Sequence, residues 1–213
     1  MNINYQKELD KIIDELVRTK QVSTLLLHSC CAPCSSYCLE YLANFFKITI
    51  FYYNPNIFPE EEYEKRVVEQ QMFIQKLPTK YPVSFLSGNY DTKQFYDMVK
   101  GYETEPEGGE RCFRCYELRL REAAIMAKEK GFDYFTTTLS ISPHKNAMKL
   151  NEIGQSLAKQ YEVSYLPSDF KKKNGFKRST ELAKEYDLYR QDYCGCAFSK
   201  RMNEEKEESK GTF

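Results

Sequence analysis

Residues 22–34, VSTLLLHSCCAPC, join a short apolar run to a turn that is rich in cysteine. The run has the length and the apolar character of a buried β-strand. Pro33 suits the first turn of a helix, because the N–H that it lacks has no partner there in any case. After it, apolar residues recur at the spacing of one helix face, at Tyr37, Cys38, Tyr41, Leu42 and Phe45. The stretch therefore predicts a strand, a tight turn and a helix.

The same alternation continues along the chain. Further strands are predicted at residues 47–53, 83–87, 132–139 and 163–166, and helices at 5–17, from Pro59 onward, and at 91–100, 111–130, 147–160 and 178–186. Strands that alternate with helices favour a single α/β domain over residues 1–202, with a parallel five-stranded sheet and helices on both faces. Residues 203–213 are predicted to be a polar C-terminal tail. In such a sheet the binding crevice lies at the carboxyl ends of the strands.

Composition and missing motifs exclude several classes of protein. The 213 residues carry 31 basic and 31 acidic side chains, which excludes a uniformly basic nucleic-acid coat protein. We expect no membrane contact and a cytoplasmic location, because no apolar run is long enough to span a bilayer and the first residues do not form a signal peptide. The first strand-to-helix turn holds cysteines where a nucleotide-binding protein keeps a glycine-rich loop, which disfavours ATP and NAD chemistry.

The eight cysteines indicate a metal or redox centre, since structural disulfides are rare in the cytoplasm. Seven of them fall into three groups, and Cys38 is predicted to pack in the core. A zinc site would suit the pair Cys112 and Cys115 together with Cys194 and Cys196, since zinc prefers two close pairs. It would leave the adjacent pair Cys30 and Cys31, with Cys34 after it, unexplained. Iron–sulfur clusters take cysteines at irregular spacing and are favoured, while zinc and metal-free thiol–disulfide chemistry stay open.

A basic segment follows the last predicted strand and is predicted to reach the same edge of the sheet. Residues 171–178, KKKNGFKR, contain five basic residues and no acid, and include an aromatic ring. Lysines near an exposed aromatic side chain suit an RNA backbone and an unstacked base, although a solvated face is the alternative. The candidate RNA-binding residues are Lys171, Lys172, Lys173, Lys177, Arg178 and Arg190, with His144 as a phosphate contact or a solvent-exposed side chain.

Five motifs in this order resemble the cobalamin-independent epoxyqueuosine reductases. They are HSCCAPCS at 28–35, GGERCFRCYELRL at 108–120, SISPHKN at 140–146, SDFKKKNG at 168–175 and YRQDYCGC at 189–196. The resemblance covers about residues 25–198. It implies a fold similar to the adenine-nucleotide α-hydrolase (PP-loop, or HUP) group, with the phosphate loop replaced by the cysteine turn.

The resemblance also implies an activity, which is the last step of queuosine synthesis. The family removes the epoxide oxygen of epoxyqueuosine at the wobble position of tRNA. It implies a [4Fe–4S] cluster, an additional mononuclear iron and no cobalamin. The expected partners are tRNA that carries epoxyqueuosine and an electron donor of the ferredoxin or flavodoxin type.

Residue roles carried over by position are expectations of the same resemblance. The metal ligands are expected to be Cys30, Cys31, Cys112 and Cys115, with Cys34 as a reserve ligand and Asp169 as an oxygen ligand. Cys194 and Cys196 are expected to form a redox pair that passes electrons or closes a disulfide. Lys145 or a thiol is expected to protonate the leaving oxygen, next to a catalytic Cys31. Two alternatives stay open: a zinc-stabilised tRNA-binding module, and a cluster-dependent, PP-loop-like tRNA sulfurtransferase.

Overall fold

The predicted strands form one sheet of five parallel strands in the order β3-β2-β1-β4-β5. The computed structural model describes residues 3–202, so the predicted tail at 203–213 lies outside the described residues. The strand bounds are Ser23–His28 for β1, Phe46–Tyr52 for β2, Ser84–Ser87 for β3, Tyr134–Thr137 for β4 and Ser164–Tyr165 for β5. The predicted fold class, a parallel α/β sheet in a single domain, is confirmed.

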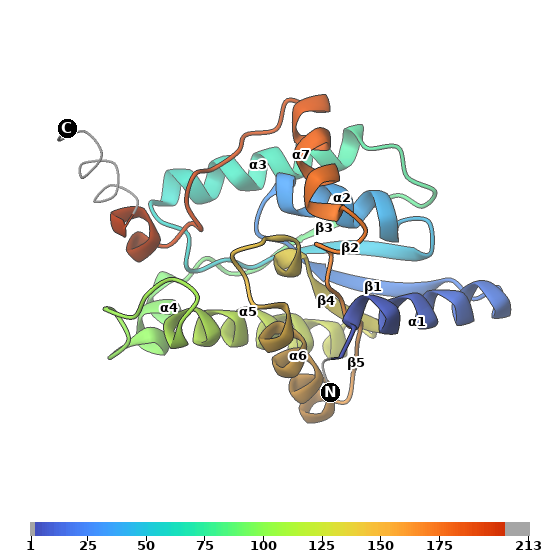
Figure 1. Cartoon of the computed structure of the whole chain (residues 1–213), viewed down its shortest axis with the longest axis horizontal. Coiled ribbons are helices and arrows are strands. Elements are labelled where there is room, and N and C mark those ends of the chain that lie inside the picture. Colours follow the sequence, from blue (N-terminus) through green and yellow to red (C-terminus); the bar gives the residue numbers. More distant parts are fainter. Residues whose placement is uncertain (1–2, 203–213) are drawn as a thin grey trace.

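Helices cover both faces of this sheet (Figure 1). One side carries α1 (Tyr5–Thr19), α2 (Ala32–Leu42) and α3 (Glu60–Lys76), with α7 (Gly175–Glu185) packed on α2. The other side carries α4 (Thr92–Val99), α5 (Glu110–Glu129) and α6 (Ala147–Tyr161). The strand side chains alternate accordingly, since Leu25 and Leu27 pack with the first set and Leu26 packs with the second.

Several predicted bounds were wrong by one to three residues, and those of β4, β5 and α7 bear on the site. Strand β4 ends at Thr137 rather than at residue 139, because the Thr137 hydroxyl accepts a hydrogen bond from the Leu139 N–H and starts a 3₁₀ turn, η1 (Thr138–Ile141). Strand β5 has only two residues, although the Leu166 N–H still donates to the Phe135 carbonyl. Helix α7 begins at Gly175 rather than at residue 178.

The strand order places a binding crevice at one point of the sheet. From β1 the chain proceeds outward through β2 to β3, whereas β4 and β5 lie on the opposite side of β1. The connections therefore diverge between β1 and β4, and ligands in open α/β sheets bind outside the carboxyl ends of the strands at such a point. The cysteine turn after β1 and η1 after β4 both lie there.

The early start of α7 depends on a glycine, and this gives a first prediction. A Cβ at Gly175 would lie 1.9 Å from the Phe170 carbonyl oxygen and 2.5 Å from the Tyr37 ring. We expect Gly175→Ala to lower the free energy of unfolding by about 2 kcal/mol or more, as in other overpacked sites. Urea denaturation measures the change. Gly131→Ala is the comparison: it meets no atom within 4 Å but needs a φ of +69°, so it should cost only about 1 kcal/mol. Equal costs would contradict the close approach.

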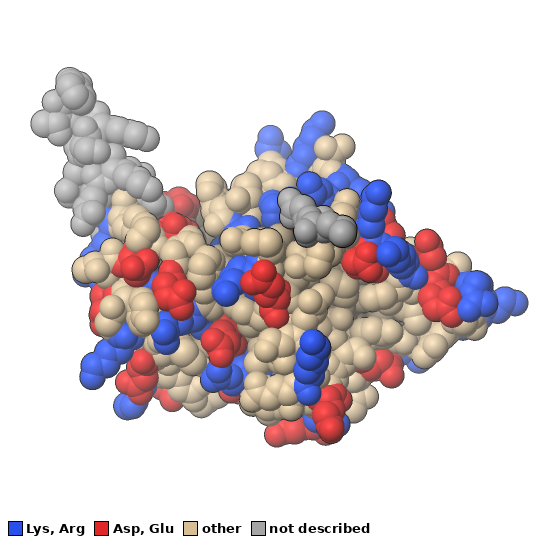
Figure 2. All heavy atoms as spheres, turned by 60° about the horizontal axis from the view of Figure 1, so that its bottom comes forward, with Lys and Arg blue, Asp and Glu red and all other residues tan. Residues whose placement is uncertain are grey.

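The side of the described molecule that carries α4, α5 and α6 has no large patch of one charge sign in the view of Figure 2. In Figure 2, Lys and Arg side chains are interspersed with Asp and Glu across that face. Within residues 3–202, no helix is both long enough and apolar enough to cross a bilayer.

Candidate active site

Three cysteines gather in the turn between β1 and α2. The Sγ atoms of Cys30, Cys31 and Cys34 all lie within 4.8 Å of one another, a spacing that suits a metal ion. Cys31 is the N-cap residue of α2 in extended backbone, and Pro33 occupies the first turn of that helix. We call these three residues the cysteine triad.

The thiols of the triad act on one another electrostatically. Hydrogen bonds from Cys31 and Cys34 hold the pKa of Cys30 well below its ordinary value. Burial raises the pKa of Cys31 to about 12, and the hydrogen bond with Cys30 raises the pKa of Cys34. The triad thus favours one thiolate that accepts from two thiols. A metal ion would replace those protons, since thiolates are the metal-binding form of cysteine.

A second group of cysteines comes from two segments far apart in the sequence. Cys112 and Cys115 lie at the start of α5, and Cys194 and Cys196 flank Gly195 near the C-terminal end of the described chain. All four line one small cavity of about 20 Å³. We call them the cysteine tetrad. Burial raises the pKa of Cys115 to about 11 and that of Cys196 to about 12.

Backbone contacts fix the C-terminal half of the tetrad. Gly195 has a φ of +116°, a conformation that favours glycine. Its carbonyl accepts from the Phe58 N–H at 2.8 Å, and the Tyr193 hydroxyl donates to the Phe58 carbonyl at 2.7 Å. These bonds hold the Cys-Gly-Cys turn against the segment that follows β2.

An open cavity of about 350 Å³ adjoins both cysteine groups. The triad contributes Cys30 and Cys34 to its wall, and the tetrad contributes Cys194. Polar, charged and aromatic side chains complete the wall, among them His144, Lys145, Phe176, Arg190 and Gln191. A cavity of this volume holds a small ligand such as a modified nucleobase.

Two contacts connect this wall to sulfur. The Lys145 ammonium donates to the Cys194 Sγ at 3.3 Å, and the Gln191 amide Nε2 donates to the Cys31 Sγ at 2.9 Å. Burial alone would lower the pKa of Lys145, but the electrostatic effects of Cys194 and Cys30 more than offset it and raise the pKa. Lys145 therefore keeps its proton beside the sulfur atoms.

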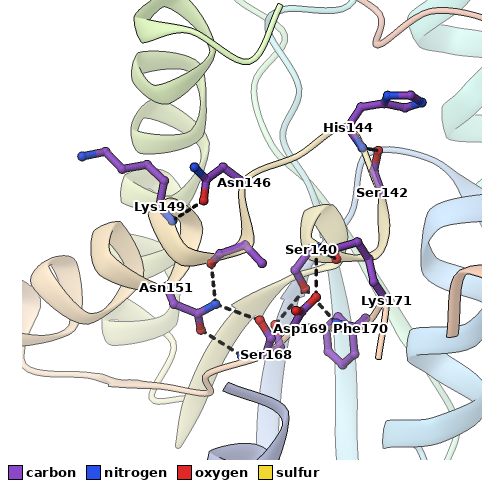
Figure 3. A network of polar contacts seen from close by, with 11 residues as sticks. Ser140, Ser142, His144, Asn146, Lys149, Asn151, Ser168, Asp169, Phe170 and Lys171 are labelled. Carbon is purple, nitrogen blue, oxygen red and sulfur yellow. Dashed lines mark hydrogen bonds and ion pairs between the residues drawn. The ribbon is translucent and has the colours of Figure 1, made fainter. Parts of the chain in front are cut away.

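The loops after β4 and β5 are tied together under the cavity (Figure 3). The buried Asn151 amide donates to the Ser168 carbonyl at 2.8 Å and accepts from the Ser168 N–H at 2.9 Å. The Ser140 hydroxyl bonds with that of Ser168 at 3.1 Å. The His144 ring points away from this network, so the loop holds its backbone and leaves its side chain free to face a ligand.

The predicted site residues divide into those at the cavity and those away from it. The triad, the tetrad, Lys145, His144 and Arg190 line one or both cavities or adjoin them. Asp169 does not line either cavity, and its carboxylate pairs with Lys171 at 2.9 Å. Cys38 packs in the core as expected, fully buried. His28 is buried too and contacts the Thr137 hydroxyl and the Tyr53 carbonyl.

The basic segment is partly neutralised by acids from other elements. Lys173 pairs with Asp10 of α1 at 2.7 Å, and Arg178 pairs with Glu40 of α2 at 2.5 Å. Lys172 and Lys177 are exposed and have no ion pair within residues 3–202. These two lysines, with Arg190 at the cavity, are therefore the cations of the set that remain most available to a phosphate.

Comparison with known proteins decides the family. A model of the family described as epoxyqueuosine reductase QueH matches residues 25–202. The chain belongs to the QueH family. It is 43% identical to the epoxyqueuosine reductase QueH of Streptococcus pyogenes over 95% of this chain and 82% of that protein. The QueH of Staphylococcus epidermidis is 45% identical over 92% and 84%, and that of Thermotoga maritima is 35% identical over 87% and 94%.

The QueH match covers all eight cysteines and leaves out α1. The resemblance drawn from the five motifs is therefore confirmed. Sequence reasoning missed Gln191, Arg119 and Asn56, which adjoin the cysteines in the QueH fold of this chain. Arg119 had a usable signal, since it lies one helical turn after Cys115. Gln191 had none, because 160 residues separate it from Cys31.

Proposed function

We propose that this chain removes the epoxide oxygen of epoxyqueuosine at the wobble position of tRNA and so forms queuosine. The QueH match supports the reaction, and the observation that carries it in the structure is the cavity at the strand ends, which adjoins two separate groups of cysteines. The change from epoxide to alkene consumes two electrons and two protons, and the oxygen leaves as water. It therefore needs an electron source and a proton donor at one cavity.

The residues fit an iron–sulfur centre. The tetrad offers four thiols around one cavity, and buried cations of the same wall offer the positive charge that a thiolate centre needs. We propose that Cys112, Cys115, Cys194 and Cys196 hold a [4Fe–4S] cluster, which supplies electrons one at a time. Cys30, Cys31 and Cys34 would hold the additional iron. Asp169, the expected oxygen ligand, lines neither cavity and pairs with Lys171, so it would have to leave that ion pair to bind the iron.

This grouping differs from the ligand set expected from the sequence, which combined Cys30 and Cys31 with Cys112 and Cys115. It also competes with the expected redox pair, because Cys194 and Cys196 cannot form a disulfide while both bind the cluster. The shared cavity of the tetrad supports the new grouping.

The chain's own side chains would prepare the substrate for reduction. Cys31 is buried next to Cys30 and Cys34, which line the cavity, and its Sγ accepts from Gln191, so its orientation is fixed before the substrate arrives. The Lys145 ammonium, 3.3 Å from the Cys194 Sγ, keeps its proton and can donate it to the departing oxygen, which is the stronger base. Phe176 is 40% exposed at the rim and offers a stacking surface for a base.

The tRNA is proposed to approach over the basic segment, and this gives a second prediction. We expect Lys172→Ala to weaken tRNA binding and to reduce the slope of log K against log salt by about 0.7–0.9 for the lost phosphate contact. Fluorescence anisotropy at several salt concentrations measures the slope. Lys47→Ala is the matched control, since Lys47 is exposed near the amino end of β2, away from the cavity. An unchanged slope in Lys172→Ala would make this segment a solvated face.

The remaining partners follow from the same proposal. Electrons would come from a ferredoxin or flavodoxin, no cobalamin would take part, and the reaction would occur in the cytoplasm where tRNA is modified.

Metal analysis tests this proposal against the zinc-stabilised binding module, which the tetrad would also suit. Iron, acid-labile sulfide and zinc are measured on protein purified without oxygen. We expect about four or five irons and about four sulfides per chain, in brown protein. One zinc per chain with no sulfide and no colour would contradict the reductase. A requirement for ATP in the reaction would instead support the sulfurtransferase.

A further inference from the structure

Glu107 lies at the border between the two cavities of the site. Within residues 3–202 it is the acidic residue that lines both of them, since Asp192 lines only the open cavity. Glu107 is exposed, so a ligand in the open cavity can reach its carboxylate. No Lys, Arg or His of the described chain forms an ion pair with it. The site therefore contains a carboxylate that has no cationic partner among the described residues.

Hydrogen bonds hold this carboxylate in place, although Glu107 belongs to the loop before α5. The buried Arg111 guanidinium donates to the Glu105 carbonyl at 2.5 Å and so ties the loop to the first turn of α5. The Ser199 hydroxyl accepts from the Cys194 N–H at 3.2 Å and donates to Glu107 Oε2 at 3.3 Å. Because Ser199 is buried, its hydroxyl fixes the carboxylate relative to Cys194.

Two cations in the wall of the open cavity oppose the binding of a positively charged ligand. Lys145 keeps its proton beside the Cys194 Sγ, and Arg190 is always charged. Both would repel a cation that entered the cavity, and more strongly than in bulk water, because the dielectric constant of a protein site is lower. A cationic ligand therefore needs a carboxylate to bind there, and Glu107 offers one.

The proposed substrate carries such a cation. In epoxyqueuosine an aminomethyl linker joins the deazaguanine base to the ring that bears the epoxide, and its secondary amine is protonated at neutral pH, as alkyl amines are. With the base against Phe176 at the rim and the epoxide toward the sulfur atoms, this linker would cross the cavity between them.

We propose that the Glu107 carboxylate binds the secondary ammonium of the epoxyqueuosine side chain and so selects a wobble base that carries an alkyl amine. This inference deepens the proposed function and rests on it for the identity of the ligand. A charge-assisted hydrogen bond of this kind is about twice as strong as a neutral one, so its loss should be measurable in binding alone.

The test compares three tRNAs that differ only in the wobble base. Guanine has no alkyl amine, 7-aminomethyl-7-deazaguanine has the amine alone, and the queuosine base has the amine and the hydroxylated ring. We expect Glu107→Gln, as anaerobically purified holoprotein, to bind the second and third tRNAs about tenfold or more weakly than the wild type. It should bind the guanine tRNA at least as tightly as the wild type does. Fluorescence anisotropy measures the three dissociation constants.

A general electrostatic effect would have the opposite sign. Removal of a negative charge beside a polyanion such as tRNA strengthens the attraction between them, so weaker binding confined to the amine-bearing tRNAs indicates a direct contact. Glu103→Gln is the matched control, because Glu103 lies in the same loop, is exposed and lines neither cavity. It should leave the preference among the three tRNAs unchanged.

The remaining outcomes would overturn the proposal. Weaker binding of the queuosine tRNA alone would place Glu107 at the ring hydroxyls, and equal weakening for all three tRNAs would show a role in loop structure. Equal affinity of the wild type for the guanine and aminomethyl tRNAs would show that the amine is not recognised. Failure of the proposed function is a separate result: wild-type holoprotein that contains iron and sulfide would leave epoxyqueuosine-tRNA unreduced.

Discussion

Cys31→Ser should lose at least about 10²-fold in turnover of epoxyqueuosine-tRNA. Replacing a group that contacts a metal ligand typically lowers metal affinity or activity by about 10–100-fold. Loss of a ligand itself should therefore lower the rate by at least about 100-fold. Cys31 has the position for this role: its Sγ lies within 4.8 Å of those of Cys30 and Cys34 and accepts from Gln191. Single-turnover kinetics with excess reductant measures the loss.

The matched control for this prediction is Cys38→Ala. Cys38 is a cysteine within α2, the helix that Cys31 caps, and it is fully buried. Within residues 3–202, the hydrogen bond of its Sγ goes to the Cys34 carbonyl. It should keep its activity and lose about 1 kcal/mol of stability. Full turnover in Cys31→Ser would contradict the catalytic assignment. An equal loss in both variants would show that disturbance of α2, not the chemistry of Cys31, lowers the rate.

The second large effect is on iron content, and it separates the two possible groupings of cysteines. We expect Cys115→Ser and Cys194→Ser each to lose the cluster, with its sulfide and about four irons. Cys31→Ser should keep the sulfide and lose only the additional iron. Iron and sulfide analysis with visible spectra of the three anaerobically purified variants measures the difference.

The two possible sets of cluster ligands predict different iron and sulfide contents for these variants. Loss of sulfide in Cys31→Ser together with its retention in Cys194→Ser would contradict the tetrad. That pattern would restore the set expected from the sequence, in which Cys30, Cys31, Cys112 and Cys115 bind the cluster and Cys194 acts in a redox pair. The experiment therefore tests the shared cavity of the tetrad directly.

Local patterns were enough to predict the fold. Strand lengths, apolar spacing and cap residues gave a parallel α/β sheet, and the rule for strand ends placed the turns after β1 and β4 at one crevice. The triad could be anticipated in the same way, because Cys30, Cys31 and Cys34 are neighbours in the sequence. The predicted bounds of β4 and α7 were wrong because the true bounds depend on the Thr137 hydroxyl and on a close approach to the Phe170 carbonyl. Neither contact can be read from the spacing of apolar residues.

Contacts between distant segments could not be decided from the sequence. A zinc site would group Cys112 and Cys115 with Cys194 and Cys196, whereas the family resemblance groups them with Cys30 and Cys31, and only the folded chain shows the first set lining one cavity. The basic segment contains no acid of its own, so its pairing with Asp10 and Glu40 appeared only in the folded chain. The cost of burying Arg119 likewise exists only once α5 packs against the cysteine turn.

The fate of the epoxide oxygen decides whether this chain is an epoxyqueuosine reductase. Iron-loaded protein is incubated without oxygen with epoxyqueuosine-containing tRNA and a chemical reductant in the absence of ATP, and the nucleosides are analysed by mass spectrometry. We expect queuosine, lighter than the starting nucleoside by one oxygen atom, in amounts that depend on protein and reductant. Unchanged epoxyqueuosine with protein that contains iron and sulfide and binds the tRNA would contradict it.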